Sequence, residues 1–115
     1  MKIDICSDLH VPLNGSIQWS KIKNKDSTIL VVAGDTSNSI FKTADVLNSA
    51  SLLYDKVIAV LGNHDFYDYA SPDNGIDAIG RLVKGNVDVL GGSRISSMIK
   101  LENGNHKAFI GNTGW

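Results

Sequence analysis

The sequence predicts an α/β fold of the α+β sandwich type, made of βαβ units that lead into a terminal β-hairpin. Two observations support this prediction: short β-branched apolar runs alternate with longer polar stretches, and one of those polar stretches has the spacing of an amphipathic helix. Parallel strands need such a crossover, and a buried parallel sheet makes its strands read as continuous apolar runs. A chain of 115 residues is long enough to bury one hydrophobic core.

Three apolar runs in the first half of the chain predict parallel strands. "KIDIC", residues 2–6, has two isoleucines in alternation, whereas "TILVVAG", 28–34, and "KVIAVLG", 56–62, are uninterrupted and predict buried strands. Between the last two, a helix is predicted with Ser37 or Asn38 as its N-cap. The apolar face of that helix consists of Ile40, Ala44, Leu47 and Ala50 or Ser51.

The second half of the chain predicts a helix, a strand and a hairpin. A short helix is expected within residues 73–85, closed by Gly85, and "NVDVLGG", 86–92, is typical of a strand. "RISSMIKLENGNHKAFIG", 94–111, predicts a hairpin, because the Asn and Gly at its centre tolerate positive φ. Residues 11–27 fit either a mobile connection or a short helix. The expected helix face is Ile76, Ile79, Leu82 and Val83, and the expected turn is Asn103, Gly104 and Asn105.

Composition and charge exclude several classes of function. The formal net charge is −1, from 11 basic and 12 acidic residues, which gives no global field to gather nucleic acid or anionic lipid. The single cysteine, Cys6, cannot form an internal disulfide and is expected to be a small buried hydrophobe. No apolar stretch approaches the ~20 residues of a membrane span. A soluble cytoplasmic protein without a membrane or nucleic-acid partner is therefore expected.

Three of the predicted strands end in residues that ionise or bind metal. Carboxyl ends of parallel strands share one edge of the sheet, where ligands of open α/β sheets bind. Each motif alone also fits a turn, a helix cap or a surface histidine, but turn chemistry does not explain why such residues recur at three strand ends. The residues are Asp8 and His10, then Asp35, then Asn63, His64 and Asp65.

These side chains form a mixed nitrogen and oxygen ligand set. Such a set suits Mn²⁺, Fe or Zn²⁺ better than metals that prefer thiolates. The carboxylate of Asp35 has two oxygens and can bridge two cations, which lie ~3.5 to 4 Å apart in two-metal sites. The sequence therefore predicts a site for two divalent metal ions.

The series "DLH", "GD" and "GNHD", each at the end of a predicted strand, resembles the calcineurin-like metallophosphoesterases. The spacing agrees, because 27 positions separate Asp8 from Asp35 and 28 separate Asp35 from Asn63, enough for one βα unit each. The resemblance implies that Asp8 and His10 are ligands of a first metal. It also implies that Asp35 bridges both metals and that Asn63 binds the second through its carboxamide oxygen.

The resemblance also assigns the remaining residues of the third strand end. His64 is similar to the catalytic histidine of the family, which contacts the phosphate and can protonate the leaving group. Asp65 would hydrogen-bond His64 and fix its tautomer, and the nucleophile would be a hydroxide that bridges the two metals. "GDTSN" departs from the frequent GDxxD form by placing Asn38 last, but that acid is not a metal ligand in the family.

The family completes its site with further histidines, one alone and then a GHxH pair, which this sequence does not supply. Its third histidine, His106, lies in the predicted hairpin, where we expect an exposed strand residue. The resemblance thus covers residues 1–115 as the N-terminal portion of a single, incomplete domain. A C-terminal half or an oligomer partner would complete the site.

The leading hypothesis is a metal-dependent phosphoesterase that hydrolyses a phosphomonoester or phosphodiester substrate. The alternative is a truncated or degenerate relative that binds metal weakly, or docks on a partner, without turnover. A third class, the α/β nucleotide binders, lacks support because neither GxGxxG nor GxxxxGK[ST] occurs.

Overall fold

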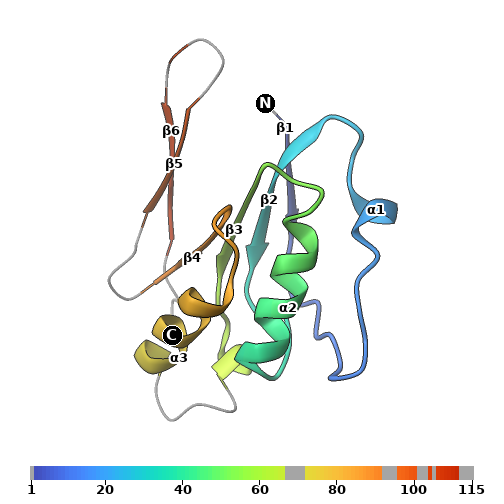
Figure 1. The fold of residues 1–115 in the computed structure, drawn as a ribbon, viewed down its shortest axis with the longest axis vertical. Coiled ribbons are helices and arrows are strands. Elements are labelled where there is room, and N and C mark those ends of the chain that lie inside the picture. The colour runs from blue at the N-terminus through green and yellow to red at the C-terminus, as the bar shows by residue number, and fades with distance from the viewer. Residues whose placement is uncertain (1, 67–71, 92–95, 101–103, 105, 112–115) are drawn as a thin grey trace.

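The computed structural model describes residues 2–66, 72–91, 96–100, 104 and 106–111. It confirms the predicted mixed α/β architecture: four parallel strands lie in the order β1-β2-β3-β4, and two further strands form an antiparallel pair (Figure 1). Gly104 has a φ of 86°, whereas Asn103 and Asn105 of the expected turn lie outside the described residues. The elements are β1 (Lys2–Cys6), α1 (Trp19–Ile22), β2 (Ser27–Ala33), α2 (Ile40–Ala50), β3 (Lys56–Val60), η1 (Asn63–Phe66), α3 (Pro72–Leu82), β4 (Val87–Leu90), β5 (Ser96–Lys100) and β6 (His106–Ile110).

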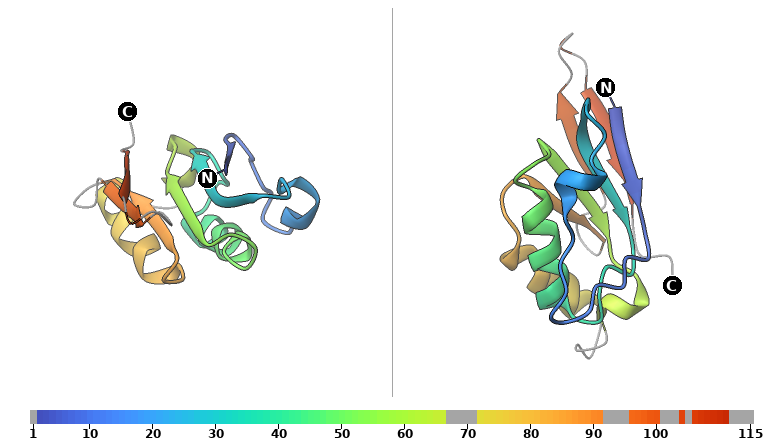
Figure 2. Two further views of the ribbon diagram at one scale, coloured as in Figure 1. Left: turned by 90° about the horizontal axis from the view of Figure 1, so that it is seen from above. Right: turned by 90° about the vertical axis from the view of Figure 1, so that its right-hand side faces the viewer.

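The parallel sheet has two differently covered faces, which explains the continuous apolar runs of its central strands. Leu30 and Val32 of β2 are buried in the core beneath α2 and α3, whereas Ile29 belongs to a second cluster with Ile99 of β5 and Phe109 of β6. Figure 2 shows α2 and α3 on one side of the sheet. Alternate residues of one strand therefore serve two separate cores.

Helix α2 begins at Ile40, and its N-cap is Ser39, not Ser37 or Asn38 as predicted. The hydroxyl of Ser39 accepts a hydrogen bond from the amide of Phe41 at 3.2 Å, which satisfies one of the free donors of the first turn. Ser37 is only 1% exposed and belongs to a buried polar cluster. The expected apolar face is confirmed, because Ile40, Ala44, Leu47, Ala50 and Ser51 are all buried.

Helix α3 ends at Leu82, before the Gly85 that was expected to close it. The side chain of Asn48, from α2, donates to the carbonyl of Leu82 at 3.0 Å and accepts from the amide of Lys84 at 2.8 Å. This long-range cap satisfies the last turn and ends the helix. Leu82, expected on the buried face, is consequently 41% exposed at the helix end, whereas Ile79 is fully buried.

The segment between β1 and β2 contains a short helix, one of the two forms that the sequence allowed. Trp19 opens α1, is 4% exposed, and its indole Nε1 donates to the carbonyl of Val46 at 3.3 Å and to Ser49 Oγ at 3.1 Å. Both acceptors belong to α2. The side chain of Trp19 therefore fixes this segment against α2. None of the helices in the described part of the chain is long and apolar enough to cross a membrane.

A buried ion pair lies where β4 meets the hairpin. Asp88 is 3% exposed, contacts Lys56 Nζ at 2.7 Å and accepts a hydrogen bond from Ser97 of β5. Such a pair offsets the cost of removing the carboxylate from water. Three apolar side chains of β1, β5 and β6 remain exposed to solvent: Ile5 at 74%, Met98 at 66% and Ile110 at 80%.

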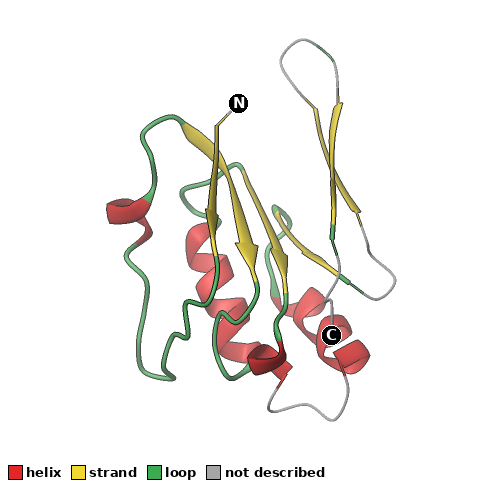
Figure 3. Ribbon diagram, turned by 180° about the vertical axis from the view of Figure 1, so that it is seen from behind, coloured by secondary structure: helices red, strands yellow, loops and turns green. Residues whose placement is uncertain are grey.

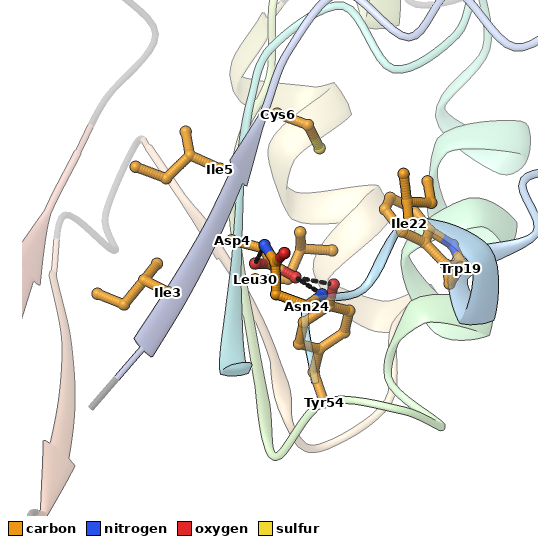
Figure 4. A pocket seen from close by; sticks show the side chains of 9 residues that line it. All are labelled: Ile3, Asp4, Ile5, Cys6, Trp19, Ile22, Asn24, Leu30 and Tyr54. Atoms are coloured by element: carbon orange, nitrogen blue, oxygen red, sulfur yellow. Dashed lines mark hydrogen bonds between the residues drawn. The ribbon is translucent and has the colours of Figure 1, made fainter. Parts of the chain in front are cut away.

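Asp4 links three separate segments beside a pocket of about 190 Å³ (Figure 4). Its Oδ2 accepts from the Tyr54 hydroxyl at 2.6 Å, and its Oδ1 accepts from Ser27 Oγ at 2.7 Å and from Asn24 Nδ2 at 2.6 Å. The hydrogen bond from Tyr54 is the largest cause that holds the pKa of Asp4 well below its ordinary value of 3.8, and the bonds from Asn24 and Ser27 add to it. Burial of the carboxyl group opposes the shift. Burial and the neighbouring Asp4 charge also raise the pKa of the half-buried Cys6 thiol.

We expect Asp4 to make folding stability depend on pH. Its carboxyl pKa is lower in the folded chain than in the unfolded chain, so its contribution is complete above the unfolded value of 3.8 and is lost as the pH falls below that value. Urea unfolding at about pH 6 and about pH 3 measures this effect: the free energy of unfolding of the wild type should exceed that of Asp4→Asn by less at about pH 3 than at about pH 6. In the Tyr54→Phe background, the difference that Asp4→Asn makes should change less between the two pH values, because the main cause of the low pKa is missing. An advantage of Asp4 that stays constant over this range would contradict the assignment.

Candidate metal centre

The segments that follow β1 and β2 are joined by backbone hydrogen bonds at the carboxyl edge of the sheet (Figure 3). The amide of Asp8 donates to the carbonyl of Gly34 at 3.0 Å, and the amide of His10 donates to the carbonyl of Asp35 at 3.1 Å. A parallel bridge between Val11 and Ser37 continues the pairing. The first two predicted strand ends are therefore held side by side by their main chains.

Three residues of these segments have left-handed backbone conformations. The φ angles are 54° at Asp8, 46° at His10 and 52° at Asp35. A residue with a Cβ pays roughly 1 to 2 kcal/mol to adopt this conformation. Strain of this kind gathers at functional sites, where the surrounding structure holds it in place. The hydrogen bonds between the two segments provide that support.

The side chains of Asp8, His10 and Asp35 converge on one point. One ligand atom from each residue lies within 4.8 Å of the others, and His10 Nε2 is 3.8 Å from Asp8 Oδ1. Ligands ~2.1 Å from a cation lie at most about twice that distance apart, so the cluster needs only slight tightening to hold one. Asp8 and His10 are exposed and Asp35 is partly so, which leaves the cluster open to solvent. The donor set fits a divalent cation of the Mn²⁺, Fe or Zn²⁺ class.

The third strand end contacts this cluster through η1. The amide of His64 donates to Asp35 Oδ1 at 3.1 Å, and the imidazole of His64 lies edge-on to that of His10, with ring centroids 5.0 Å apart. Asn63 is exposed at the start of η1, directly before His64. The structure thus brings Asp8, His10, Asp35 and His64 together, with Asn63 beside them in the chain. His106 is exposed on β6, as expected, and does not belong to the cluster.

Asp65 does not form the expected side-chain hydrogen bond with His64. Its carboxylate is fully buried and accepts from the amide of Ser37 at 3.0 Å, from Thr43 Oγ1 at 2.6 Å and from the amide of Gly62 at 2.9 Å. The side chain therefore connects the loop after β2, helix α2 and the loop after β3. Its neighbour in sequence has a different partner, because His64 Nδ1 lies 3.2 Å from Asn38 Oδ1.

Sequence reasoning missed the part that Ser37, Asn38 and Thr43 play around the site. The sequence predicts Ser37 or Asn38 as the N-cap of α2 and assigns no role to Thr43. Ser37 Oγ and Thr43 Oγ1 lie 2.8 Å apart, so the two hydroxyls and Asp65 form one buried network. The sequence contains one indication of this network: Thr43 is a polar residue directly before Ala44 of the predicted apolar face, where a hydroxyl group would need a buried partner.

The family model for the calcineurin-like phosphoesterases matches residues 1–112. Among curated proteins and among solved structures, no match was found.

Proposed function

The chain belongs to the calcineurin-like phosphoesterase family, and from this premise we propose that its three strand ends form a dinuclear metal site for phosphate-ester hydrolysis. The family supports a metal-dependent phosphoesterase in general. The observation that carries the finer proposal is the convergence of Asp8, His10 and Asp35 within 4.8 Å of one another. These residues come from two separate strand ends, and no turn or helix cap requires their side chains to meet.

We assign a first metal ion to Asp8, His10 and Asp35, and a second to Asp35 and Asn63. Asp35 is suited to the shared position, because one of its oxygens already accepts from the amide of His64 and its loop lies between the other two. When bound, two divalent ions would lower the pKa of water and neutralise negative charge on a phosphate group. The exposed side chains of Asp8 and His10 leave room for a phosphate ester to approach.

His64 is the proposed catalytic acid. Its ring lies beside that of His10, so a phosphate held at the cluster would be within reach of an imidazole. A protonated imidazole can give its proton to the leaving oxygen, and such catalysis contributes typically about 10² to 10⁴ in rate. Asp65 acts as a positioning residue, because its buried carboxylate ties the loop of Asn63 and His64 to the loop of Asp35.

Hydrolysis of a chromogenic phosphodiester and of a chromogenic phosphomonoester with Mn²⁺ tests this proposal. With the site completed by a C-terminal half or an oligomer partner, we expect turnover that a chelator abolishes, a fall of more than about 100-fold in Asp35→Asn, and a fall of about 10² or more in kcat for His64→Ala. His106→Ala is the matched control, since His106 is an exposed histidine outside the cluster, and its activity should equal that of the wild type. Full activity in both Asp35→Asn and His64→Ala would overturn the assignment.

The same cluster supports a second candidate, a metal-binding relative without turnover. In the described part of the chain, the cluster consists of three side chains of the Asp, Glu, His or Cys type. Three ligands are enough to hold one ion weakly. Saturable Mn²⁺ binding by the wild-type chain, with no hydrolysis of either ester even when the site is completed, would favour this candidate over the enzyme.

A further inference from the structure

The pocket beside Asp4 lies between β1 and the segment that contains α1 (Figure 4). Its volume of about 190 Å³ exceeds the roughly 150 Å³ of an apolar protein cavity that holds benzene. Asp8, His10 and Asp35 are not among the described residues that line it. There is therefore room for a small molecule that does not occupy the metal centre.

The walls of this pocket are mainly apolar and aromatic. Trp19 and Tyr54 are buried, whereas Ile22 is 55% exposed, so its part of the wall faces solvent. Both aromatic rings are fixed, because the indole Nε1 of Trp19 donates to the carbonyl of Val46 at 3.3 Å and the hydroxyl of Tyr54 donates to Asp4 at 2.6 Å. Two aromatic side chains are thus in place before a ligand binds, which lowers the entropic cost of binding.

The carboxylate of Asp4 is saturated with hydrogen bonds but forms no ion pair among the described residues. A carboxylate has about four acceptor sites. Those of Asp4 are occupied by the hydroxyls of Tyr54 and Ser27 and by the backbone and side-chain nitrogens of Asn24. In the described part of the chain, no Lys, Arg or His nitrogen lies within 4.0 Å of this carboxylate, and Lys23 Nζ donates to the carbonyl of Asn24 at 3.2 Å. Asp4, whose pKa is lowered, thus stays charged at neutral pH but has no acceptor site left for a further N–H donor.

We propose that this pocket binds an organic cation whose charge is carried by a methylated ammonium group. Such a group has no N–H to donate, so it needs a negative charge and aromatic rings nearby and not a free acceptor. The ring of Tyr54 already has a cation of the chain close to it, because Lys23 Nζ lies 5.5 Å from its centroid. A primary ammonium ion, by contrast, would give up hydrogen bonds to water without finding an acceptor on Asp4. The inference does not depend on the proposed phosphoesterase activity.

Titration of the metal-free chain with choline, a trimethylammonium ion, tests the proposal. The indole N–H signal of Trp19 in ¹H–¹⁵N correlation spectra reports on the pocket. We expect a saturable shift with choline and none with sodium chloride at the same ionic strength. The uncharged isostere of choline, in which a tert-butyl group replaces the trimethylammonium group, should bind at least about tenfold more weakly. Ethanolamine, a primary ammonium ion, should also bind more weakly than choline.

Two variants separate the charge of the pocket from its shape. Asp4→Asn removes the charge and should weaken choline binding by about tenfold or more. Because that change also disturbs the hydrogen bonds of Asp4, Ile22→Lys tests the same point at an exposed position, where a second cation should repel choline to a similar extent. Met98→Lys is the matched control, since Met98 is exposed and is not among the described residues that line the pocket, and it should bind choline like the wild type.

Three results would overturn the inference. The first is the absence of a saturable Trp19 shift with choline in the wild type. The second is equal binding of choline and its uncharged isostere, which would make the pocket merely apolar. The third is undiminished choline binding in Ile22→Lys, which would place the bound cation elsewhere on the chain.

Discussion

Gly62→Ala is expected to lower the affinity of the chain for Mn²⁺ by more than about tenfold, the effect seen when a residue that supports a metal ligand is lost. A Cβ at position 62 would lie 2.1 Å from Asp35 Oδ1 and 2.7 Å from both Asp35 Cγ and the Asp35 amide nitrogen. A change of side-chain rotamer cannot relieve the contact with the backbone nitrogen, so Asp35 itself must move. Calorimetric titration of both proteins with Mn²⁺ measures the change.

Gly80→Ala is the matched control for this experiment. Gly80 lies within α3, and a Cβ there would meet no atom within 4 Å. Alanine at this position should raise the free energy of unfolding by roughly 0.5 to 1 kcal/mol and leave Mn²⁺ affinity unchanged. If Gly62→Ala also bound Mn²⁺ like the wild type, Asp35 would have no essential place in the metal site.

Asp65→Ala should be the most destabilising single change at the site, with a loss of about 2 to 6 kcal/mol in the free energy of unfolding, since each of the two amides left without an acceptor costs about 1 to 3 kcal/mol. The substitution leaves the amides of Ser37 and Gly62 without their acceptor and removes a partner from Thr43 Oγ1, and the carboxylate that it removes is fully buried. Urea unfolding followed by circular dichroism measures the loss. Asp65→Asn should also destabilise, because its NH₂ group would face a donor whichever way the amide is turned.

Asp77→Ala is the control for Asp65→Ala, because it removes an exposed carboxylate in place of a buried one. Asp77 lies on α3 and is exposed, so its removal should change the free energy of unfolding by no more than about 0.5 kcal/mol. A loss below about 1 kcal/mol in Asp65→Ala would show that the three hydrogen bonds do not hold the loops together.

The strands and the positions of the site residues could be predicted because both depend on local pattern. A run such as residues 28–34 has few alternatives to a buried strand, and parallel strands bring their carboxyl ends to one edge whatever the details of packing. This topology places Asp8, His10 and Asp35 at one edge of the sheet, where their side chains converge.

The errors concern contacts between residues that are distant in sequence. Asp65 adjoins His64 in the chain, yet its partners are 3, 22 and 28 positions away, and the ring of His64 finds Asn38 instead. The end of α3 is likewise set by Asn48 of another helix. Such pairs depend on how loops and helices dock, which hydrophobic periodicity does not encode.

Binding of Mn²⁺ to the 115-residue chain tests the central claim most directly, since every proposed step requires a metal at the strand ends. In calorimetric titrations, we expect saturable binding to the wild type, unchanged affinity in Asp77→Asn, and a loss of more than about 100-fold in Asp35→Asn. No binding to the folded wild-type chain, or equal binding by wild type and Asp35→Asn, would contradict the claim that Asp8, His10 and Asp35 form a metal centre.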